Sequence, residues 1–339
     1  MMLEHGGQLN DAAERWGIPR SEWLDLSTGI NPIGWPVPNI PAEVWQRLPE
    51  ADDGLDDIIR EWSGASSAAC VPVPGSQAAI MALPRLRKPC RVGIPVPGYR
   101  EHGHSWRHAG HRIVPIAPEQ TGGGFSGCDD RWLDQLDVLV WINPNNPTGA
   151  IIPPSTLMRW HQRLQKRGGW LVVDEAFMDA TPAFSLCFHA GLPGLVVLRS
   201  LGKFFGLAGV RAGVVLADNR IAEGLKQALG PWVLSGPARY VMRQVLTDTA
   251  WQWQARTRLQ RSACTLREML QAAGLTLAGG SALFQTVRID NPKILADQLA
   301  ARAVLVRVFD QPGMVRFGLA ADERQSQKLM EALAARKCD

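Results

Sequence analysis

The sequence predicts an α/β fold in which a large domain with a mostly parallel sheet is joined to a smaller α+β domain. The chain has 339 residues, of which 46% are hydrophobic and 20% charged, and this size is enough for two separate cores. Short apolar runs alternate with helical stretches over the first two thirds of the chain. This alternation ends near residue 218, where longer helical segments begin.

The apolar runs of the first part predict buried strands. An uninterrupted apolar run of about four to eight residues, bounded by polar or turn residues, is typical of a strand that is covered on both faces. The runs lie at 91–95, 138–143, 170–176, 195–200 and 212–217, with a helical stretch at 155–167. Strands that alternate with helices in this way predict a parallel sheet with helices on both sides.

The chain after residue 218 predicts a different arrangement. Helical segments at 220–229 and 236–273 precede strands at 281–289, 303–309 and 314–320 and a closing helix at 322–336. We expect the first 40 or so residues to return to this smaller domain. The predicted organisation is an N-terminal segment (1–40) that joins the small domain, a large domain (41–217), and interdomain helices with the small domain (218–339).

Charge and composition exclude several classes of function. A formal net charge of +4, spread along the chain, is too small to predict nucleic-acid binding, although a phosphorylated small molecule remains a fitting ligand. No run approaches the roughly 20 apolar residues of a membrane span, and the N-terminus lacks the apolar core of a signal peptide. The six cysteines form no C-x-x-C pair. We expect a cytoplasmic protein without a disulfide framework or a zinc site.

Polar residues that follow the predicted strands are the first candidates for a site, because open α/β sheets bind ligands at the carboxyl ends of their strands. Asp174 ends the run WLVV, and a carboxylate there would keep a pyridine nitrogen protonated, so that the ring could accept electrons. A loop or helix-capping aspartate is the alternative. Ser200 and Arg211 flank a lysine, Lys203, and both can donate to a phosphate.

Lys203 precedes two phenylalanines, Phe204 and Phe205. Partial desolvation there would lower its pKa and favour Schiff-base chemistry, whereas a lone lysine in another context would more often lie on the surface.

Three further motifs predict contacts with the same ligand. Gly75, Ser76 and Gln77 stand where an extended stretch turns into a helix, and free backbone N–H groups at such a start suit an anion. Asn146, in NPNNPTG, could bond a ring hydroxyl, and Tyr99, after another strand, could stack on a ring. Taken singly, Asn146 could belong to a simple turn and Tyr99 to the core.

In chain order, the motifs GSQAAI, PGY, NPNNPTG, DEAF and RSLGKFFGLAGVRAG span most of residues 70–217. Together they resemble the aspartate aminotransferase superfamily, the fold type I enzymes that use pyridoxal 5′-phosphate (PLP). The resemblance implies that Lys203 binds PLP covalently, that Asp174 pairs with the pyridinium, and that Asn146 contacts the ring hydroxyl and the substrate carboxylate. It further implies that Tyr99 stacks on the ring and that the PLP phosphate is bound by Ser76, Gln77, Ser200 and Arg211.

Within this superfamily the chain resembles the threonine-phosphate decarboxylases of cobalamin synthesis more than the histidinol-phosphate aminotransferases. The resemblance is carried by HGG at 5–7, by LDLSTGINPIG at 24–34, and by Phe177 where the aminotransferases have tyrosine. It implies decarboxylation of L-threonine O-3-phosphate to (R)-1-amino-2-propanol O-2-phosphate by a homodimer. The implied substrate-binding residues are His5, Gly6, Gly7, Gly29, Ile30, Asn146, Arg307 and Arg316, with Arg316 on the α-carboxylate.

Two positions depart from the family pattern. Gln8 replaces the asparagine that follows HGG, and Leu48 replaces a tyrosine that would reach the neighbouring subunit's PLP phosphate. We expect His5, Gly6 and Gly7 to fold over the site as a lid and, with Arg307, to bind the substrate phosphate. A disordered leader is the alternative, because terminal segments fray unless they are tied down.

Two other functions remain open at this point. One is an aminotransferase such as a histidinol-phosphate aminotransferase, since the same residues would serve transamination. The other is a non-catalytic role, as a regulator or as a partner subunit in cobalamin assembly, although only about 70 residues precede the cofactor motifs and Lys203 and Asp174 are retained. A histidine cluster, His102, His104, His108 and His111, could suggest a metal. It shows no carboxylate or cysteine partner, so we expect surface or helix-packing roles and no metal.

Overall fold

A seven-stranded sheet forms the centre of the larger part of the molecule, in a computed structural model that describes residues 5–117 and 130–336. Its strand order is β2-β8-β7-β6-β5-β3-β4. The strands are β2 (Ala69–Val73), β3 (Arg91–Pro95), β4 (Arg112–Ile116), β5 (Val138–Ile142), β6 (Trp170–Asp174), β7 (Leu195–Ser200) and β8 (Gly213–Ala217). Neighbouring strands from β4 to β7 pair in parallel, and β8 is antiparallel to both of its neighbours. The predicted α/β class with a mostly parallel sheet is therefore confirmed.

Helices cover both faces of this sheet because its strands are apolar on both sides. Val138 and Val140 face α4 (Ser76–Ala82), α5 (Arg100–His108) and α7 (Asn219–Leu229). Leu139 and Trp141, on the opposite face of the same strand, pack with α3 (Leu55–Ser63), α6 (Pro154–Gln165) and α8 (Gly236–Thr247). This alternation follows from the side-chain period of two in a strand.

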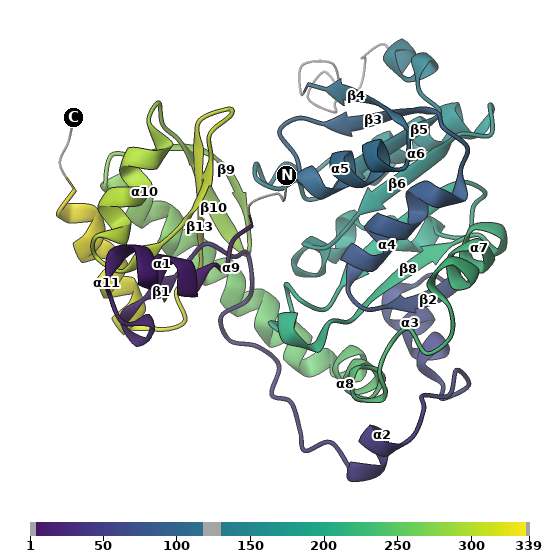
Figure 1. Cartoon of the computed structure of the whole chain (residues 1–339), viewed down its shortest axis with the longest axis horizontal. Coiled ribbons are helices and arrows are strands. Elements are labelled where there is room, and N and C mark those ends of the chain that lie inside the picture. The colour runs from purple at the N-terminus through teal and green to yellow at the C-terminus, as the bar shows by residue number, and fades with distance from the viewer. Residues whose placement is uncertain (1–4, 118–129, 337–339) are drawn as a thin grey trace.

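The smaller part of the molecule is built on an antiparallel sheet of order β12-β13-β10-β9. Its strands are β9 (Thr276–Ser281), β10 (Phe284–Arg288), β12 (Arg307–Phe309) and β13 (Met314–Gly318), and its helices are α10 (Pro292–Ala300) and α11 (Glu323–Ala334). Figure 1 shows the two parts side by side, with α8 beneath the larger part and the long helix α9 (Thr249–Ala272) running from there to the smaller part.

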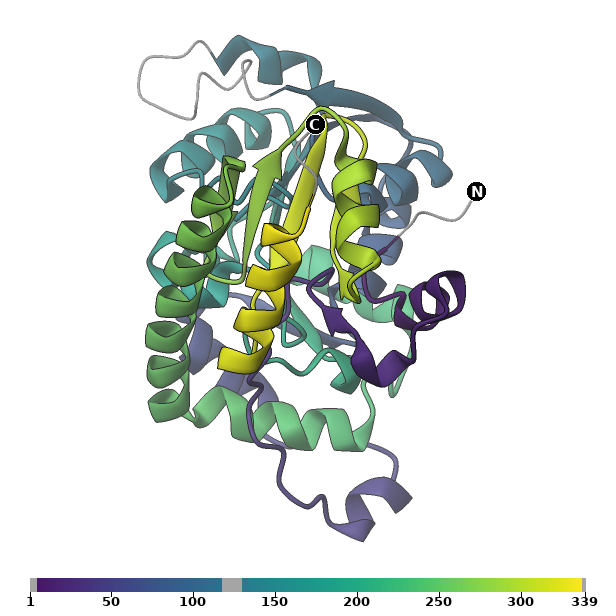
Figure 2. The same cartoon turned by 90° about the vertical axis from the view of Figure 1, so that its left-hand side faces the viewer.

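The N-terminal segment lies on the smaller part. Its strand β1 (Leu24–Asp25) pairs in parallel with β11 (Val304–Leu305), and Ala12, in α1 (Leu9–Trp16), packs in one cluster with Ala300. The chain then crosses to the larger part through a segment that carries α2 (Ala42–Gln46) and projects from the molecule in both views (Figures 1 and 2).

Several predicted elements differ from the structure. The helix predicted over 236–273 is broken at Asp248, whose carboxylate accepts a hydrogen bond from Trp251 N at 3.0 Å and so caps α9. The strand predicted over 303–309 is divided at Val306, because β11 and β12 belong to different sheets. The strands β4 and β9 were not predicted, whereas β2 falls in the stretch before Gly75 that was expected to be extended. The domain limits at residues 40 and 217 stay a prediction.

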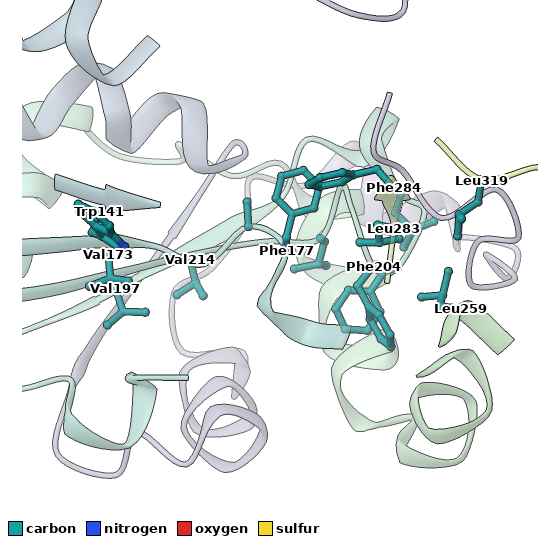
Figure 3. Close-up of a cluster of buried hydrophobic side chains, with 14 of the residues drawn as sticks. Trp141, Val173, Phe177, Val197, Phe204, Val214, Leu259, Leu283, Phe284 and Leu319 are labelled. Atoms are coloured by element: carbon teal, nitrogen blue, oxygen red, sulfur yellow. The ribbon is translucent and has the colours of Figure 1, made fainter. Parts of the chain in front are cut away.

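One continuous hydrophobic cluster joins the two parts. Figure 3 shows it extending from Trp141 and Val173 of the large sheet to Phe177 and Phe284, and on to Leu259 of α9. Phe177, just after β6, meets Phe284 of β10 edge to face, with ring centroids 5.2 Å apart. The site described below therefore lies between two parts that share a packed core. None of the helices in the described ranges is both long and apolar enough to span a membrane.

Candidate active site

A small cavity of about 140 Å³ opens at the carboxyl end of the large sheet. Parallel strands β3, β5, β6 and β7 all end there, so the residues that follow them meet at one edge. The nine residues predicted to hold the cofactor all line this cavity, namely Gly75, Ser76, Gln77, Tyr99, Asn146, Asp174, Ser200, Lys203 and Arg211.

Asp174, at the end of β6, is buried and paired with a histidine. Its Oδ2 lies 2.8 Å from Nε2 of His102 in α5, and its Oδ1 accepts a hydrogen bond from Ala176 N at 3.0 Å. These contacts satisfy a carboxylate that would be costly to bury alone. Asp174 is thus held in one orientation at the floor of the cavity.

His102 corrects the expectation of surface or helix-packing roles for the histidine cluster, because it is 1% exposed and contacts the candidate catalytic aspartate. His111 is also buried and meets Cys90, whereas His104 and His108 are exposed and stack on each other. Within residues 5–117 and 130–336, no three histidine, cysteine or acidic side chains group closely enough to hold a metal ion.

Lys203 follows β7 and reaches the same cavity. Its pKa is lowered to about 8, first by burial and then by the nearby Arg316, against the opposing effect of Asp174. Its Nζ lies 5.6 Å from the centroid of the Phe177 ring. At pH 7 a pKa near 8 leaves about one lysine in ten as the neutral amine, several hundred times more than an unperturbed lysine would have. The neutral amine is the nucleophilic form.

Gly75 and Arg211 form one wall of the cavity. Gly75 precedes α4 with φ of 75°, and a Cβ built there would lie 2.9 Å from Nη2 of Arg211. Arg211 itself has φ of 53°, a left-handed conformation that is unusual for a residue with a side chain and often marks a functional site. Ser200 lies beside it, with Oγ accepting from Gly202 N at 3.3 Å. The Ser200 hydroxyl, the Arg211 guanidinium and the Gly75 backbone, which carries no side chain, together suit a phosphate.

The side chains of Gln77 and Tyr99 are hydrogen-bonded to each other. The Tyr99 hydroxyl donates to Gln77 Oε1 at 3.1 Å, and Gln77 Nε2 donates to Glu101 Oε2 at 3.0 Å. Burial, and then the charge of Glu101, raise the pKa of the Tyr99 hydroxyl, which therefore stays protonated at neutral pH. The Gln77 side chain thus orients Tyr99, and a contact of Gln77 with a phosphate stays a prediction.

A second, larger cavity of about 710 Å³ adjoins the first and shares Tyr99, Asn146 and Lys203 with it. It lies between the two parts of the molecule. Five of the residues predicted to bind substrate line it in addition to Asn146, namely His5, Gly6, Gly7, Arg307 and Arg316. The larger cavity is therefore bordered by cationic side chains from the smaller part and by Lys203 from the larger part.

Arg316, in β13, joins the two parts directly. Its Nη1 donates to Asn146 Oδ1 at 2.7 Å and its Nη2 donates to the Ser27 carbonyl at 2.9 Å. The guanidinium lies 5.1 Å from the centroid of the Phe284 ring, and Arg307 is its direct cross-strand neighbour. Burial, and then the charge of Arg307, lower the pKa of Arg316 to about 10, so that it remains cationic at neutral pH.

Residues 5–7, which precede α1, are held by contacts at His5 and at Gly7. His5 Nε2 lies 2.8 Å from Glu101 Oε1 of α5, and Gly7 N donates to Ser27 Oγ at 2.7 Å. A Cβ at Gly6 would lie 2.4 Å from the Ser27 carbonyl oxygen, so Gly6 packs directly on that residue. Residues 5–7 thus bridge the two parts and line the larger cavity, in contrast to a disordered leader.

Gly29 and Ile30 line neither cavity. A Cβ at Gly29 would lie 2.8 Å from Cε1 of Phe177 and 3.2 Å from Cδ1 of Phe284, so a glycine is needed for these rings to meet. The structure places Gly29 against this aromatic pair, and the predicted contact of Gly29 and Ile30 with substrate stays a prediction.

Sequence reasoning missed three residues of this neighbourhood, His102, Glu101 and Ser27. Each acts through a contact with a residue that was predicted, namely Asp174, His5 or Arg316. Because these contacts join segments far apart in the chain, no local pattern announces them.

The smaller cavity fits a phosphorylated pyridine. Arg211 against the bare Gly75 backbone and Ser200 can hold a phosphate, Tyr99 presents a ring, and the buried Asp174 carboxylate can pair with a ring nitrogen. Lys203 supplies an amine of lowered pKa for an aldehyde. These are the groups that pyridoxal phosphate requires.

Comparisons with known proteins agree with this geometry. Residues 58–333 match the family model described as aminotransferase class I and II. The chain is 49% identical to a threonine-phosphate decarboxylase of Pseudomonas aeruginosa, over 98% of this chain and 97% of that protein. It is 36% identical to a threonine-phosphate decarboxylase of a Sinorhizobium species, over 98% of both.

Solved structures show the same fold at lower identity. A histidinol-phosphate aminotransferase from Sinorhizobium meliloti in complex with pyridoxal-5′-phosphate is 18% identical with a TM-score of 0.78, covering 98% of this chain and 96% of that one. L-threonine-O-3-phosphate decarboxylase from Porphyromonas gingivalis is 18% identical with a TM-score of 0.74, covering 91% of this chain and 98% of that one.

Proposed function

The chain belongs to the aminotransferase class I and II family, and on this premise we propose that it is a PLP-dependent enzyme that decarboxylates L-threonine O-3-phosphate. The reaction releases CO₂ and leaves (R)-1-amino-2-propanol O-2-phosphate. The identity of 49% with a threonine-phosphate decarboxylase over nearly the whole chain supports this substrate. By the same likeness the product would serve cobalamin synthesis.

The observation that carries the proposal is the junction of the two cavities at Lys203, Tyr99 and Asn146. One cavity fits the cofactor. The other is bordered by Arg307, Arg316 and a histidine, which suits a substrate that carries both a carboxylate and a phosphate.

The residues of the smaller cavity would hold PLP, with Lys203 as its covalent attachment and Ser200 and Arg211 on its phosphate. When bound, PLP supplies an aldehyde that captures the substrate amine and a protonated pyridine ring that accepts the electron pair of the breaking bond. Asp174, oriented by His102 at 2.8 Å, would keep the proton on the ring nitrogen.

The substrate would be held by groups of this chain on two sides. Arg316 would bind the α-carboxylate together with Asn146, which its Nη1 already contacts. We assign the phosphate to Arg307 and to the N-terminal residues His5, Gly6 and Gly7, which border the same cavity. Lys203, the amine nearest to both cavities, would return a proton to Cα after CO₂ leaves.

A homodimer would complete the assembly. Trp45 and Leu48 are 65% and 63% exposed on the projecting segment, and Trp232 is 59% exposed, so large apolar side chains lie open where a second copy could cover them. Sedimentation of the wild type and of Trp45→Glu measures this. The Glu variant should shift toward the monomer, and a wild-type monomer would remove the proposal. A cytoplasmic location and a partner in cobalamin assembly stay predictions.

Product analysis tests the function. Purified protein reconstituted with PLP is incubated with threonine phosphate, or with histidinol phosphate and 2-oxoglutarate. CO₂ release without a keto acid supports the decarboxylase. Glutamate formation from the second pair would make the chain an aminotransferase, and no turnover of either substrate by PLP-loaded protein would leave the non-catalytic role.

Deletion of residues 1–7 tests the lid. The cut keeps Gln8, whose carbonyl accepts from Ala12 N at 3.1 Å and so begins α1. We expect the KM for threonine phosphate to rise strongly while the PLP spectrum stays intact, because the cofactor contacts lie in the other cavity. Unchanged kinetics would remove the lid from the proposal.

A further inference from the structure

Ser27 lies at the junction of the N-terminal segment and the arginine that faces the substrate, although it has no predicted role. The residue is 2% exposed and follows β1. It makes contacts in three directions: toward Gly7, toward Asp25 and toward Arg316. Among the described residues whose hydrogen bonds are named here, only Ser27 is bonded both to residues 5–7 and to Arg316.

The direction of the hydrogen bonds at Ser27 is settled by Asp25. Ser27 N and Ser27 Oγ both donate to Asp25 Oδ1, at 2.9 Å and 2.6 Å. A serine hydroxyl has a single hydrogen, so once it is given to Asp25 the oxygen can only accept. The lone pairs of Ser27 Oγ therefore receive the Gly7 N–H, which lies 2.7 Å away.

The backbone of Ser27 serves the other side of the junction. Its carbonyl accepts from Arg316 Nη2 at 2.9 Å, while Arg316 Nη1 reaches Asn146. Gly6 packs against that same carbonyl so closely that a Cβ there would lie 2.4 Å from the oxygen. A displacement of residues 6 and 7 therefore changes the surroundings of the group that orients Arg316.

We propose that Ser27, oriented by Asp25, is a positioning residue that couples the placement of residues 5–7 over the larger cavity to the orientation of Arg316. The binding of the substrate phosphate by the segment and the binding of the carboxylate by Arg316 then become one cooperative event. The kinetic part of this inference rests on the proposed function, and the structural part does not.

The kinetic test compares Ser27→Ala, the deletion of residues 1–7, and the two combined. Ser27→Ala removes the acceptor for Gly7 N–H and keeps the backbone carbonyl, so the KM for threonine phosphate should rise about three- to tenfold with little change in kcat. In the deleted chain the same substitution should have no further effect, because the group it serves is gone. Effects that multiply in the double variant would overturn the coupling.

Ser235→Ala is the matched control. Ser235 Oγ likewise accepts from a backbone amide, Ala238 N at 3.3 Å, but it caps α8 and lines neither cavity. It should leave the KM unchanged in both the full-length and the deleted chain.

Hydrogen exchange of the Gly7 amide, measured on the holoenzyme without substrate, tests the structural part. Exchange should be faster in Ser27→Ala and unchanged in Ser235→Ala. Gly6→Ala, which pushes the segment off Ser27 without altering it, should also speed exchange and covers the case in which Ser27→Ala folds poorly. Exchange of the Gly7 amide that is unchanged in both Ser27→Ala and Gly6→Ala would overturn the proposal. Faster exchange in a protein that does not decarboxylate threonine phosphate would uphold the positioning role and reject the proposed function.

Discussion

Replacement of Arg316 by glutamine is the most direct test of how the substrate carboxylate is held. Arg316 is 6% exposed, and its guanidinium donates to Asn146 Oδ1 and to the Ser27 carbonyl and keeps its charge at pH 7 because its lowered pKa is still about 10. Truncating one partner of a buried, charged hydrogen-bonded pair typically costs about 2–5 kcal/mol. At about 1.4 kcal/mol per factor of ten, kcat/KM should fall by roughly thirtyfold to a few thousandfold.

The assay measures CO₂ release from threonine phosphate under subsaturating conditions, with the visible absorbance of bound PLP as a check that the cofactor site is intact. Arg316→Lys should lie between wild type and Arg316→Gln, because an ammonium keeps the charge but lacks the planar fork. Arg288→Gln is the control, since Arg288 is an exposed arginine on the adjacent strand β10. A kcat/KM for Arg316→Gln within threefold of wild type, with PLP bound, would place the carboxylate elsewhere.

Three further predictions concern the cofactor side. Lys203→Ala should bind no PLP that withstands borohydride reduction. In the wild-type apoprotein the rate of PLP incorporation should rise about tenfold per pH unit below 8 and level off above it, because the neutral amine reacts; a rate that keeps rising at that slope above pH 8 contradicts the lowered pKa. Phe177→Tyr adds a hydroxyl beside Lys203 and should lower the pKa seen in a spectral pH titration of the bound cofactor, and an unshifted titration counts against that neighbourhood. His102→Leu leaves Asp174 Oδ2 without its partner and should lower kcat about ten- to a hundredfold with PLP retained, whereas normal turnover would show that the pair is dispensable.

Much of the cofactor cavity could be predicted because the parallel sheet itself assembles it. Tyr99, Asn146, Asp174 and Lys203 each follow a different strand, and strands that run the same way bring their carboxyl ends to one edge. The apolar runs and the polar residues after them are therefore enough to predict which side chains meet at this edge. The roles assigned to these residues remain predictions that the variants above test.

The remaining contacts could not be predicted because they depend on tertiary placement. His102 is 72 positions from Asp174, and Ser27 is 289 positions from Arg316. The division of 303–309 at Val306 has the same origin, since the residues on either side pair with different sheets. A continuous apolar pattern carries no information about which partner strand each half will find.

Lys203 and Arg316, two of the cationic side chains at the site, are connected through an aromatic pair, and this arrangement favours an anionic ligand. Lys203 Nζ lies 5.6 Å from the Phe177 ring, Phe177 meets Phe284 at 5.2 Å, and Arg316 lies 5.1 Å from Phe284. Arg316 lowers the pKa of Lys203, and Arg307 lowers the pKa of Arg316. Each positive charge thus disfavours the protonated form of its neighbour. Without PLP, about one Lys203 side chain in ten is therefore neutral at pH 7, far more than at the ordinary pKa of a lysine. A carboxylate and a phosphate bound beside the arginines would cancel that repulsion and raise the pKa of Lys203, which favours the protonated lysine at the stage when Cα needs a proton.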